Sequence, residues 1–288
     1  MIRKMILAMS MIGLLTVSCS TNDDGNGQNT STLTLNLTGL EALGLDYVYE
    51  GWIIVDGAPV STGRFSSNNF PQSFQVDTDQ LNSASTFVLS IEPLVDPDPA
   101  PAATKILAGD FNGDSAMVNT GLIGDFSNAS GSFFLRTPTD EMGVNNGNDE
   151  NGIWFGTPGM PPTPNFVLPS LPEGWAYEGW VVGDAGPLST GTFTAFDMVD
   201  NSAPFSETTQ AGPPVPGEDF FLNAPSGETF PLDLRGRTVV ISVEPVPDDS
   251  FAPFVLKPLV GTAGNETAPF THDLGLNLAS LPTGTVSR

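Results

Sequence analysis

Residues 49–65 read YEGWIIVDGAPVSTGRF, and residues 177–193 read YEGWVVGDAGPLSTGTF. The second stretch begins 128 positions after the first and aligns with it without a gap. Tyr, Glu, Gly, Trp, Asp, Pro, Ser, Thr, Gly and Phe recur in the same order. Agreement of this kind indicates an internal duplication, so we expect the chain to contain two copies of one structural unit.

Each stretch has the pattern of a buried strand. Tyr49, Ile53 and Val55 fall on one face of an extended chain, and Trp52 and Ile54 fall on the other, because successive strand side chains point to opposite sides. Both faces are largely apolar, which is typical of an interior strand that is covered on both sides.

A turn and a second shared block follow in each copy. Residues 56–59 (DGAP) and 184–187 (DAGP) supply turn residues, which predicts a hairpin. Residues 87–93 (FVLSIEP) match residues 239–245 (VVISVEP) at an offset of 152 positions. The second copy therefore holds 24 more residues between its blocks, in a stretch rich in Pro, Gly and acidic residues that we expect to be an enlarged loop.

The whole chain is expected to be all-β. No window of a dozen residues has helical periodicity, and 31 Gly and 26 Pro in 288 residues favour many short strands. We expect two tandem Ig-like β-sandwich repeats, although the two copies packing into one larger unit stays open. The expected division is a signal peptide at 1–18, a flexible tether at 19–30, a first repeat at 31–156, a Pro-rich linker at 157–164 and a second repeat at 165–288.

The ends of each repeat are assigned from short apolar runs. Residues 33–37 alternate Leu with polar residues and predict the opening strand of the first repeat, and residues 131–135 predict its closing strand. Residues 153–155 are expected to be a short apolar anchor. The second repeat is expected to open at 166–168 and to close at 284–286.

The N-terminus has the features of a targeting segment. Arg3 and Lys4 precede an apolar run at 5–17, which is shorter than the ~20 residues that a membrane-spanning helix needs. A small residue then precedes Cys19, and this arrangement resembles a bacterial lipoprotein box. The resemblance implies cleavage before Cys19 and lipid on its thiol. The alternative is a plain secretory signal with an incidental cysteine, which is the only one in the chain and so excludes an intramolecular disulfide.

The tether and the charge bear on location and partners. Asp23 and Asp24 resemble a short signal that displays some lipoproteins on the outer face of the cell, although a solvated linker explains them equally. The net charge of −24 repels nucleic acid and anionic membrane. We expect a lipid-anchored protein of the outer membrane, facing the periplasm or the cell surface, with no nucleic-acid partner.

The two shared blocks resemble a known family. The pattern W-x-x-x-D-G-x-P-V-S-x-G-x-F at 52–65 and its counterpart at 180–193, each followed by a strand that ends in Glu-Pro, is similar to the C-terminal extracytoplasmic domain of anti-sigma-K factors. The resemblance implies a small β-sandwich outside the cytoplasm and brings no catalytic residues. Those factors hold a sigma factor with a cytoplasmic domain that this sequence does not show, so we do not expect direct sigma-factor binding.

The sequence has few of the residues that catalytic triads and zinc sites require. His272 is the only histidine, and a Ser/His/Asp triad or a multi-histidine metal site would have to form around it. Zinc sites draw mainly on Cys and His ligands, of which the chain has one each. We therefore expect neither an enzyme nor a cofactor.

Calcium has one weak candidate site. Oxygen-bearing side chains alternate at Asp110, Asn112 and Asp114. An EF-hand loop starting at 110 would need Gly at its sixth position and Glu at its twelfth, where Ser115 and Gly121 stand. An irregular site completed by Asp96 or Asp98 stays open, and the alternative is a solvated turn.

Two glutamates lie inside the duplicated strands. Glu50 and Glu178 occupy equivalent positions, so they need not face each other as the paired carboxylates of a glycosidase do. We interpret them as hydrogen-bonded strand residues, because a buried carboxylate must find a donor or stay protonated. Glu92 and Glu244 are expected to cap the turn that the following prolines form.

The tryptophans give an alternative function. Trp52, Trp154, Trp175 and Trp180 could form a platform on which sugars stack, although aromatic residues on interior strands usually belong to the core. Our first hypothesis is a non-enzymatic, lipid-anchored envelope protein for protein interaction or sensing. The alternative is a surface lipoprotein that binds glycans.

Overall fold

The computed structural model describes residues 29–142, 147–248 and 250–288. The signal segment, Cys19 and the tether up to residue 28 lie outside the described residues. Regular structure in the described part is almost entirely strand, with one six-residue α-helix, α1 (Thr78–Ser83), and three single 3₁₀ turns. None of the helices described there is long and apolar enough to cross a membrane. The prediction of an all-β fold is confirmed.

The strands described form two antiparallel sheets of eight strands each. The first sheet holds most of the N-terminal half of the chain. Its strands, in spatial order, are β3 (Ala58–Phe65), β2 (Tyr47–Val55), β5 (Thr86–Pro93), β6 (Lys105–Asn112), β7 (Ser115–Asn119), β16 (Thr283–Ser287), β1 (Thr30–Thr38) and β4 (Gln72–Asp77).

The second sheet holds most of the C-terminal half. Its strands, in spatial order, are β11 (Pro187–Phe193), β10 (Trp175–Val182), β13 (Thr238–Pro245), β14 (Leu259–Thr262), β15 (His272–Leu276), β8 (Gly131–Leu135), β9 (Gly152–Phe155) and β12 (Gly217–Asp219). The edge strand β12 lies inside the stretch that was expected to be only an enlarged loop.

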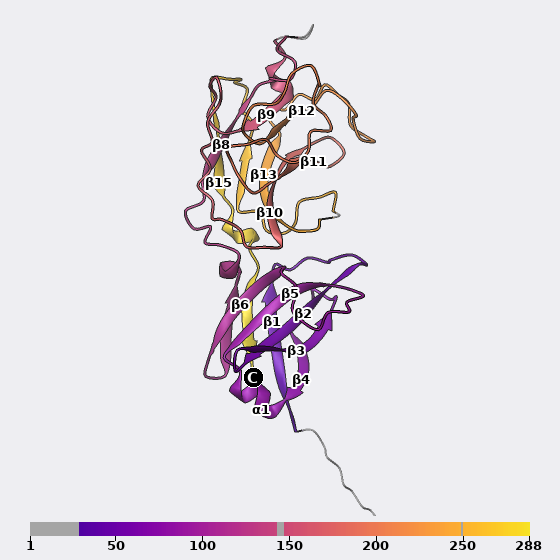
Figure 1. Cartoon of the computed structure of the whole chain (residues 1–288), viewed down its shortest axis with the longest axis vertical. Helices are drawn as coiled ribbons and strands as arrows, with labels where there is room; N and C mark the ends of the chain where they lie inside the picture. Colours follow the sequence, from indigo (N-terminus) through magenta and orange to yellow (C-terminus); the bar gives the residue numbers. More distant parts are fainter. Residues whose placement is uncertain (1–28, 143–146, 249) are drawn as a thin grey trace, which may run out of the picture.

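Each sheet curls over buried apolar residues, and those of the two sheets belong to one continuous hydrophobic cluster. In the first sheet, Phe65 on β3 packs against Phe74 on β4 with ring centroids 5.7 Å apart, so the two edge strands approach each other. The architecture is therefore that of a β-sandwich or barrel. The two curled sheets lie one above the other along the long axis of the molecule (Figure 1).

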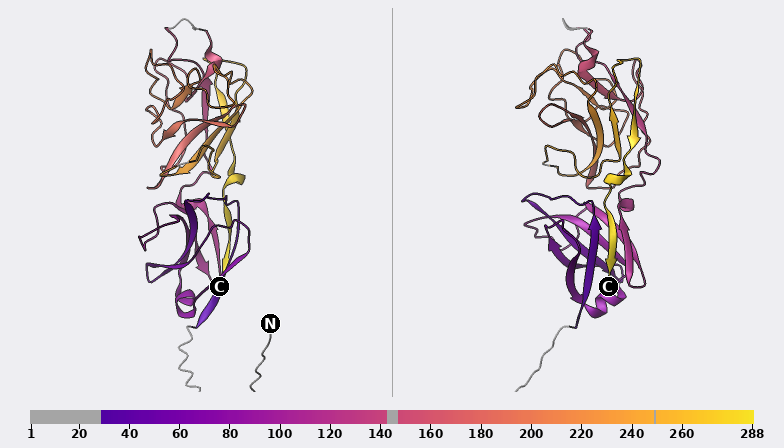
Figure 2. Two further views of the ribbon diagram at one scale, coloured as in Figure 1. Left: turned by 90° about the vertical axis from the view of Figure 1, so that its right-hand side faces the viewer. Right: turned by 180° about the vertical axis from the view of Figure 1, so that it is seen from behind.

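The two sheets exchange one strand. β16 lies between β7 and β1 of the first sheet, and β8 lies between β15 and β9 of the second. The two strand orders otherwise correspond position by position, with β16 and β8 in the same place. The C-terminal strand descends from the second sheet into the first (Figures 1 and 2). The chain therefore passes between the sheets twice, after β7 and after β15.

These pairings correct the expected ends of the repeats. Residues 131–135 do not close the first repeat and residues 284–286 do not close the second, because each strand pairs in the other sheet. Residues 153–155 form β9 rather than an anchor, and residues 157–164 lie between β9 and β10 of one sheet rather than between the sheets. Residues 166–168 contribute a single bridge, Val167 to Ser130. Alternating hydrophobicity identifies a strand but does not identify its partner.

The duplicated stretches form the same hairpin in each sheet. β2 pairs with β3, and β10 with β11, and each pairing shifts register directly before Trp52 or Trp180. A Cβ atom at Gly51 would lie 2.5 Å from Thr62 Oγ1, and one at Gly179 would lie 2.4 Å from Thr190 Oγ1. The recurring glycine is therefore required by the close approach of the neighbouring strand at this irregularity.

Candidate functional site

The duplicated strands carry a buried hydrogen-bond network. In the first sheet, Trp52 Nε1 donates to Ser90 Oγ at 2.8 Å, and Ser90 Oγ donates in turn to Glu92 Oε1. The backbone N–H of Ala102 donates to the same carboxylate oxygen at 2.9 Å. A strand, its neighbour and the loop that follows are therefore joined through one carboxylate.

The second sheet repeats this network with equivalent residues. Trp180 Nε1 donates to Ser242 Oγ at 2.8 Å, and Ser242 donates to Glu244. The Phe254 N–H donates to both oxygens of Glu244, at 2.9 and 3.1 Å. Glu92 and Glu244 each accept a hydrogen bond from a backbone N–H ten residues later, at the far end of the loop that follows the proline. They therefore do not cap the turn at the proline itself, as was expected.

Glu50 and Glu178 accept the same first hydrogen bond. Ser61 Oγ donates to Glu50 Oε1 and Ser189 Oγ donates to Glu178 Oε1, each from the neighbouring strand of the hairpin. Both glutamates are buried. Their interpretation as hydrogen-bonded strand residues is confirmed.

The second oxygen of each glutamate has a different environment. Glu50 Oε2 lies 3.4 Å from Arg64 Nε, and the Arg64 guanidinium also donates to the backbone oxygens of Pro93 and Leu94. Thr192 stands at the position equivalent to Arg64. Glu178 Oε2 is buried and accepts no hydrogen bond from a donor in the described part of the chain.

Glu178 belongs to a cluster of three acidic residues. Glu178, Glu244 and Asp248 each place a carboxylate oxygen within 4.8 Å of the others. The pKa of Glu178 is raised to about 7, mainly by burial and in smaller part by the nearby Asp248 carboxylate. Burial also raises the pKa of Glu244 to about 8, with smaller contributions from Asp248 and Glu178 in the same direction.

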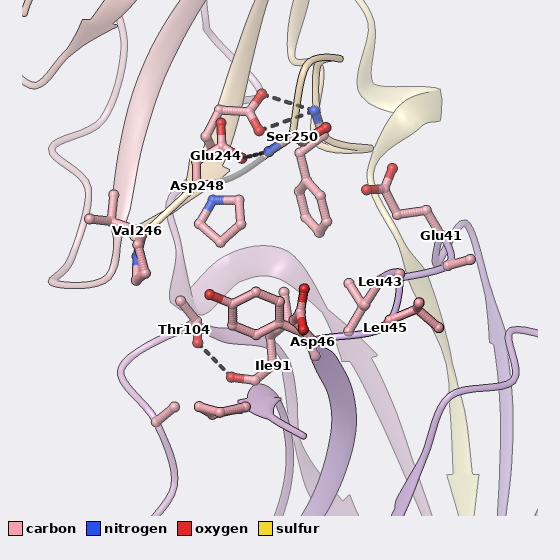
Figure 3. Close-up of a pocket in the computed structure, with 18 of the residues that line it drawn as sticks. Glu41, Leu43, Leu45, Asp46, Ile91, Thr104, Glu244, Val246, Asp248 and Ser250 are labelled. Atoms are coloured by element: carbon pink, nitrogen blue, oxygen red, sulfur yellow. Dashed lines mark hydrogen bonds between the residues drawn. The ribbon is translucent and has the colours of Figure 1, made fainter. Parts of the chain in front are cut away.

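The cluster lies at the edge of a pocket between the two sheets (Figure 3). The pocket has a volume of about 420 Å³. The first sheet lines it with residues 41–47, Ile91 and residues 102–104, and the second sheet lines it with residues 244–248, Ser250 and Phe254. Glu244 and Asp248 reach it from above in Figure 3, and Leu43, Leu45 and Asp46 from below.

The weak calcium candidate forms a hairpin turn. Asp110 and Asn112 belong to β6, and Asp114 directly precedes β7. Thr86 Oγ1 donates to Asp110 at 2.7 Å, and the backbone N–H of Arg288 donates to the Asp114 carbonyl. These contacts tie the turn to β5 and to the C-terminus, and calcium binding there stays a prediction.

His272 and the tryptophans have structural surroundings. The His272 ring packs on Phe133 with centroids 5.3 Å apart, accepts from the Gly264 N–H at Nδ1 and lies 2.8 Å from the Glu266 carbonyl at Nε2. The four tryptophans are all buried, each at most 4% exposed. They therefore do not present the stacking platform that motivated the glycan-binding alternative.

A second group of buried acids escaped the sequence analysis. Asp200, Glu218 and Asp219 lie in the longer stretch of the second copy, and burial raises their pKa values to about 7, 8 and 7. Asp219 accepts from Thr139 and from Trp154 Nε1, and Glu218 accepts from Ser206. A Gly-Glu-Asp tripeptide in a Pro-rich stretch gives no sequence signal of burial.

No family model matches the chain, and neither a curated protein nor a solved structure does.

Proposed function

We propose that the chain is a non-enzymatic, lipid-anchored envelope protein that binds a partner protein in the pocket between its two sheets. The pocket is the observation that carries the proposal, because residues far apart in the sequence converge on it from both sheets. The lipoprotein-like segment ending at Cys19 supports the anchor. The shared blocks support two tandem Ig-like modules related to the outer domain of anti-sigma-K factors.

The lining indicates the chemistry of the partner. Leu43, Leu45 and Phe254 provide apolar surface, and Leu45 is 88% exposed. Glu41 and Asp46 add negative charge beside them, within a protein whose net charge is −24. A peptide segment with an apolar side chain next to Lys or Arg complements both properties, because opposite potentials steer association and apolar contact stabilises the complex.

Position-specific cross-linking in intact source cells tests the pocket. A photoreactive residue in place of Leu45 should form a covalent adduct with one envelope protein, and the adduct should disappear when Asp46→Lys is added. The matched control replaces Met117, which is 76% exposed on β7 and does not line the pocket. An absent adduct, or the same adduct from both positions, would show that the pocket is not the binding site.

The anchor is tested separately. Cys19→Ser should move the protein from the membrane fraction to the soluble fraction, because the thiol is the expected point of lipid attachment. Retention of the Cys19→Ser variant in the membrane fraction would contradict lipid anchoring and leave the pocket result unaffected.

A further inference from the structure

The two copies differ in how they neutralise one buried carboxylate. Glu50 pairs across the hairpin with Arg64, whereas Glu178 pairs with Thr192 at the same register. In the first copy, the guanidinium therefore supplies positive charge next to Glu50 Oε2. The second copy keeps the glutamate and its serine partner, Ser189, but has no basic residue at this position.

The second copy keeps the acidic groups of the first but lacks the arginine beside them. Glu178 is 5% exposed and Glu244 is 1% exposed, and Asp248 is half-buried. Among the described residues, the groups that shift the pKa values of Glu178 and Glu244 include no basic side chain. Three carboxylates in so small a volume repel one another unless a proton or a cation lies between them.

We propose that a hard divalent cation, best matched by Ca²⁺, binds between Glu178, Glu244 and Asp248 and takes the place that the Arg64 guanidinium has in the first copy. Two observations carry the site independently of the acidic composition. Glu178 Oε2 is buried and receives no hydrogen bond from a donor in the described residues, and the equivalent oxygen of Glu50 lies against a cation.

The geometry suits calcium. Oxygens bound to one Ca²⁺ ion lie about 2.3–2.6 Å from it, so they can be at most about 5 Å apart. The three carboxylate oxygens lie within 4.8 Å of one another. All three ligands are oxygens, which hard cations prefer to nitrogen or sulfur. Asp248 also lines the pocket, through which water can complete the coordination.

A proton is the competitor of the cation. The carboxyl groups of Glu178 and Asp248 lie close enough to share a proton, and this contact contributes to the raised pKa of Glu178. Calcium binds ionised carboxylates, so it would displace that proton.

The test uses the full chain purified in detergent and treated with a chelator. Millimolar CaCl₂ should raise the Tm by about 2 °C or more, because a ligand that binds only the folded state stabilises it. Tb³⁺ should give luminescence sensitised by Trp180, which lines the same hollow as Glu178, and Ca²⁺ should quench it by displacement. No change of Tm together with no Tb³⁺ luminescence would overturn the proposal.

Matched variants separate the site from general stability. Asp248 is a half-buried loop residue, so Asp248→Asn should abolish the calcium response without unfolding the protein. Thr192→Arg should give the second copy the arginine of the first, so it should abolish the calcium response and raise the Tm in chelator. Glu50→Gln is the control and should leave the calcium response intact. A response that survives Asp248→Asn and Thr192→Arg would contradict the assigned ligands.

Discussion

Asn36 on β1 and Thr285 on β16 are cross-strand partners, although they lie near opposite ends of the chain. This pair belongs to the exchange in which β16 enters the first sheet and β8 enters the second. The exchange joins the two sheets twice, and the pocket lies at their junction. We infer that the double connection holds the two walls of the pocket in register.

The C-terminal residue should stabilise the N-terminal half of the chain. Arg288 donates to the carbonyls of Leu81 and Ala84, at 2.6 and 2.9 Å, and lies 4.4 Å from the centre of the Phe111 ring. Arg288→Ala should lower the free energy of unfolding by about 1–2 kcal/mol in urea denaturation. Arg235→Ala is the control, because its ion pair with Asp233 is exposed to solvent and should contribute little to stability. Equal effects of the two variants would contradict a specific role for Arg288.

Removing the cation of the first copy should destabilise it. Arg64→Met leaves Glu50 Oε2 buried without its positive neighbour and removes the bonds to the Pro93 and Leu94 carbonyls. We expect a loss of about 1–3 kcal/mol by urea denaturation, the usual cost of a buried polar group that loses its partner. The double variant Arg64→Met with Glu50→Gln should recover part of this loss. No recovery would show that the arginine acts through packing alone.

Stability should fall as the pH rises from about 5 to about 8. Burial raises the pKa of Glu218 from 4.5 to about 8, with Asp200 and Asp219 adding to the shift, so the folded state keeps a proton that the unfolded state releases. This contribution is fully present below pH of about 4.5 and is lost as the pH rises to about 8. Urea denaturation should therefore give a lower midpoint at about pH 8.5 than at about pH 5.

The variant Glu218→Gln tests whether Glu218 causes this dependence of stability on pH. Gln keeps an oxygen for the Ser206 hydroxyl and cannot ionise, so the difference between the two pH values should become smaller. An unchanged slope would assign the pH dependence to other groups.

Local features of the fold followed from the sequence. The duplication at 49–65 and 177–193 located both central hairpins, and the alternation at 33–37 located β1. Burial of the tryptophans also followed from their place on interior strands. These predictions succeeded because side-chain periodicity and turn chemistry act over a few residues.

Long-range pairing did not follow from the sequence. Residues 131–135 and 283–287 both have a strand pattern. Neither pattern predicts the sheet in which the strand pairs. The acidic cluster escaped for the same reason, because Asp248 lies in a loop that reaches Glu178 only after β13 pairs with β10. The alignment of the two copies shows Arg64 in one and Thr192 in the other. Only the structure shows that these residues lie opposite the buried Glu50 and Glu178.

The exchange of strands is the central claim, and an engineered disulfide tests it most directly. In a Cys19→Ser background, Asn36→Cys with Thr285→Cys places two exposed cysteines at directly paired positions. Mild oxidation should give a monomer whose tryptic digest contains a disulfide between the peptides from β1 and β16. A parallel protein with Asp273→Cys and Thr285→Cys probes the alternative in which β16 lies beside β15, and it should remain reduced. A disulfide in the second protein and none within monomers of the first would contradict the exchange.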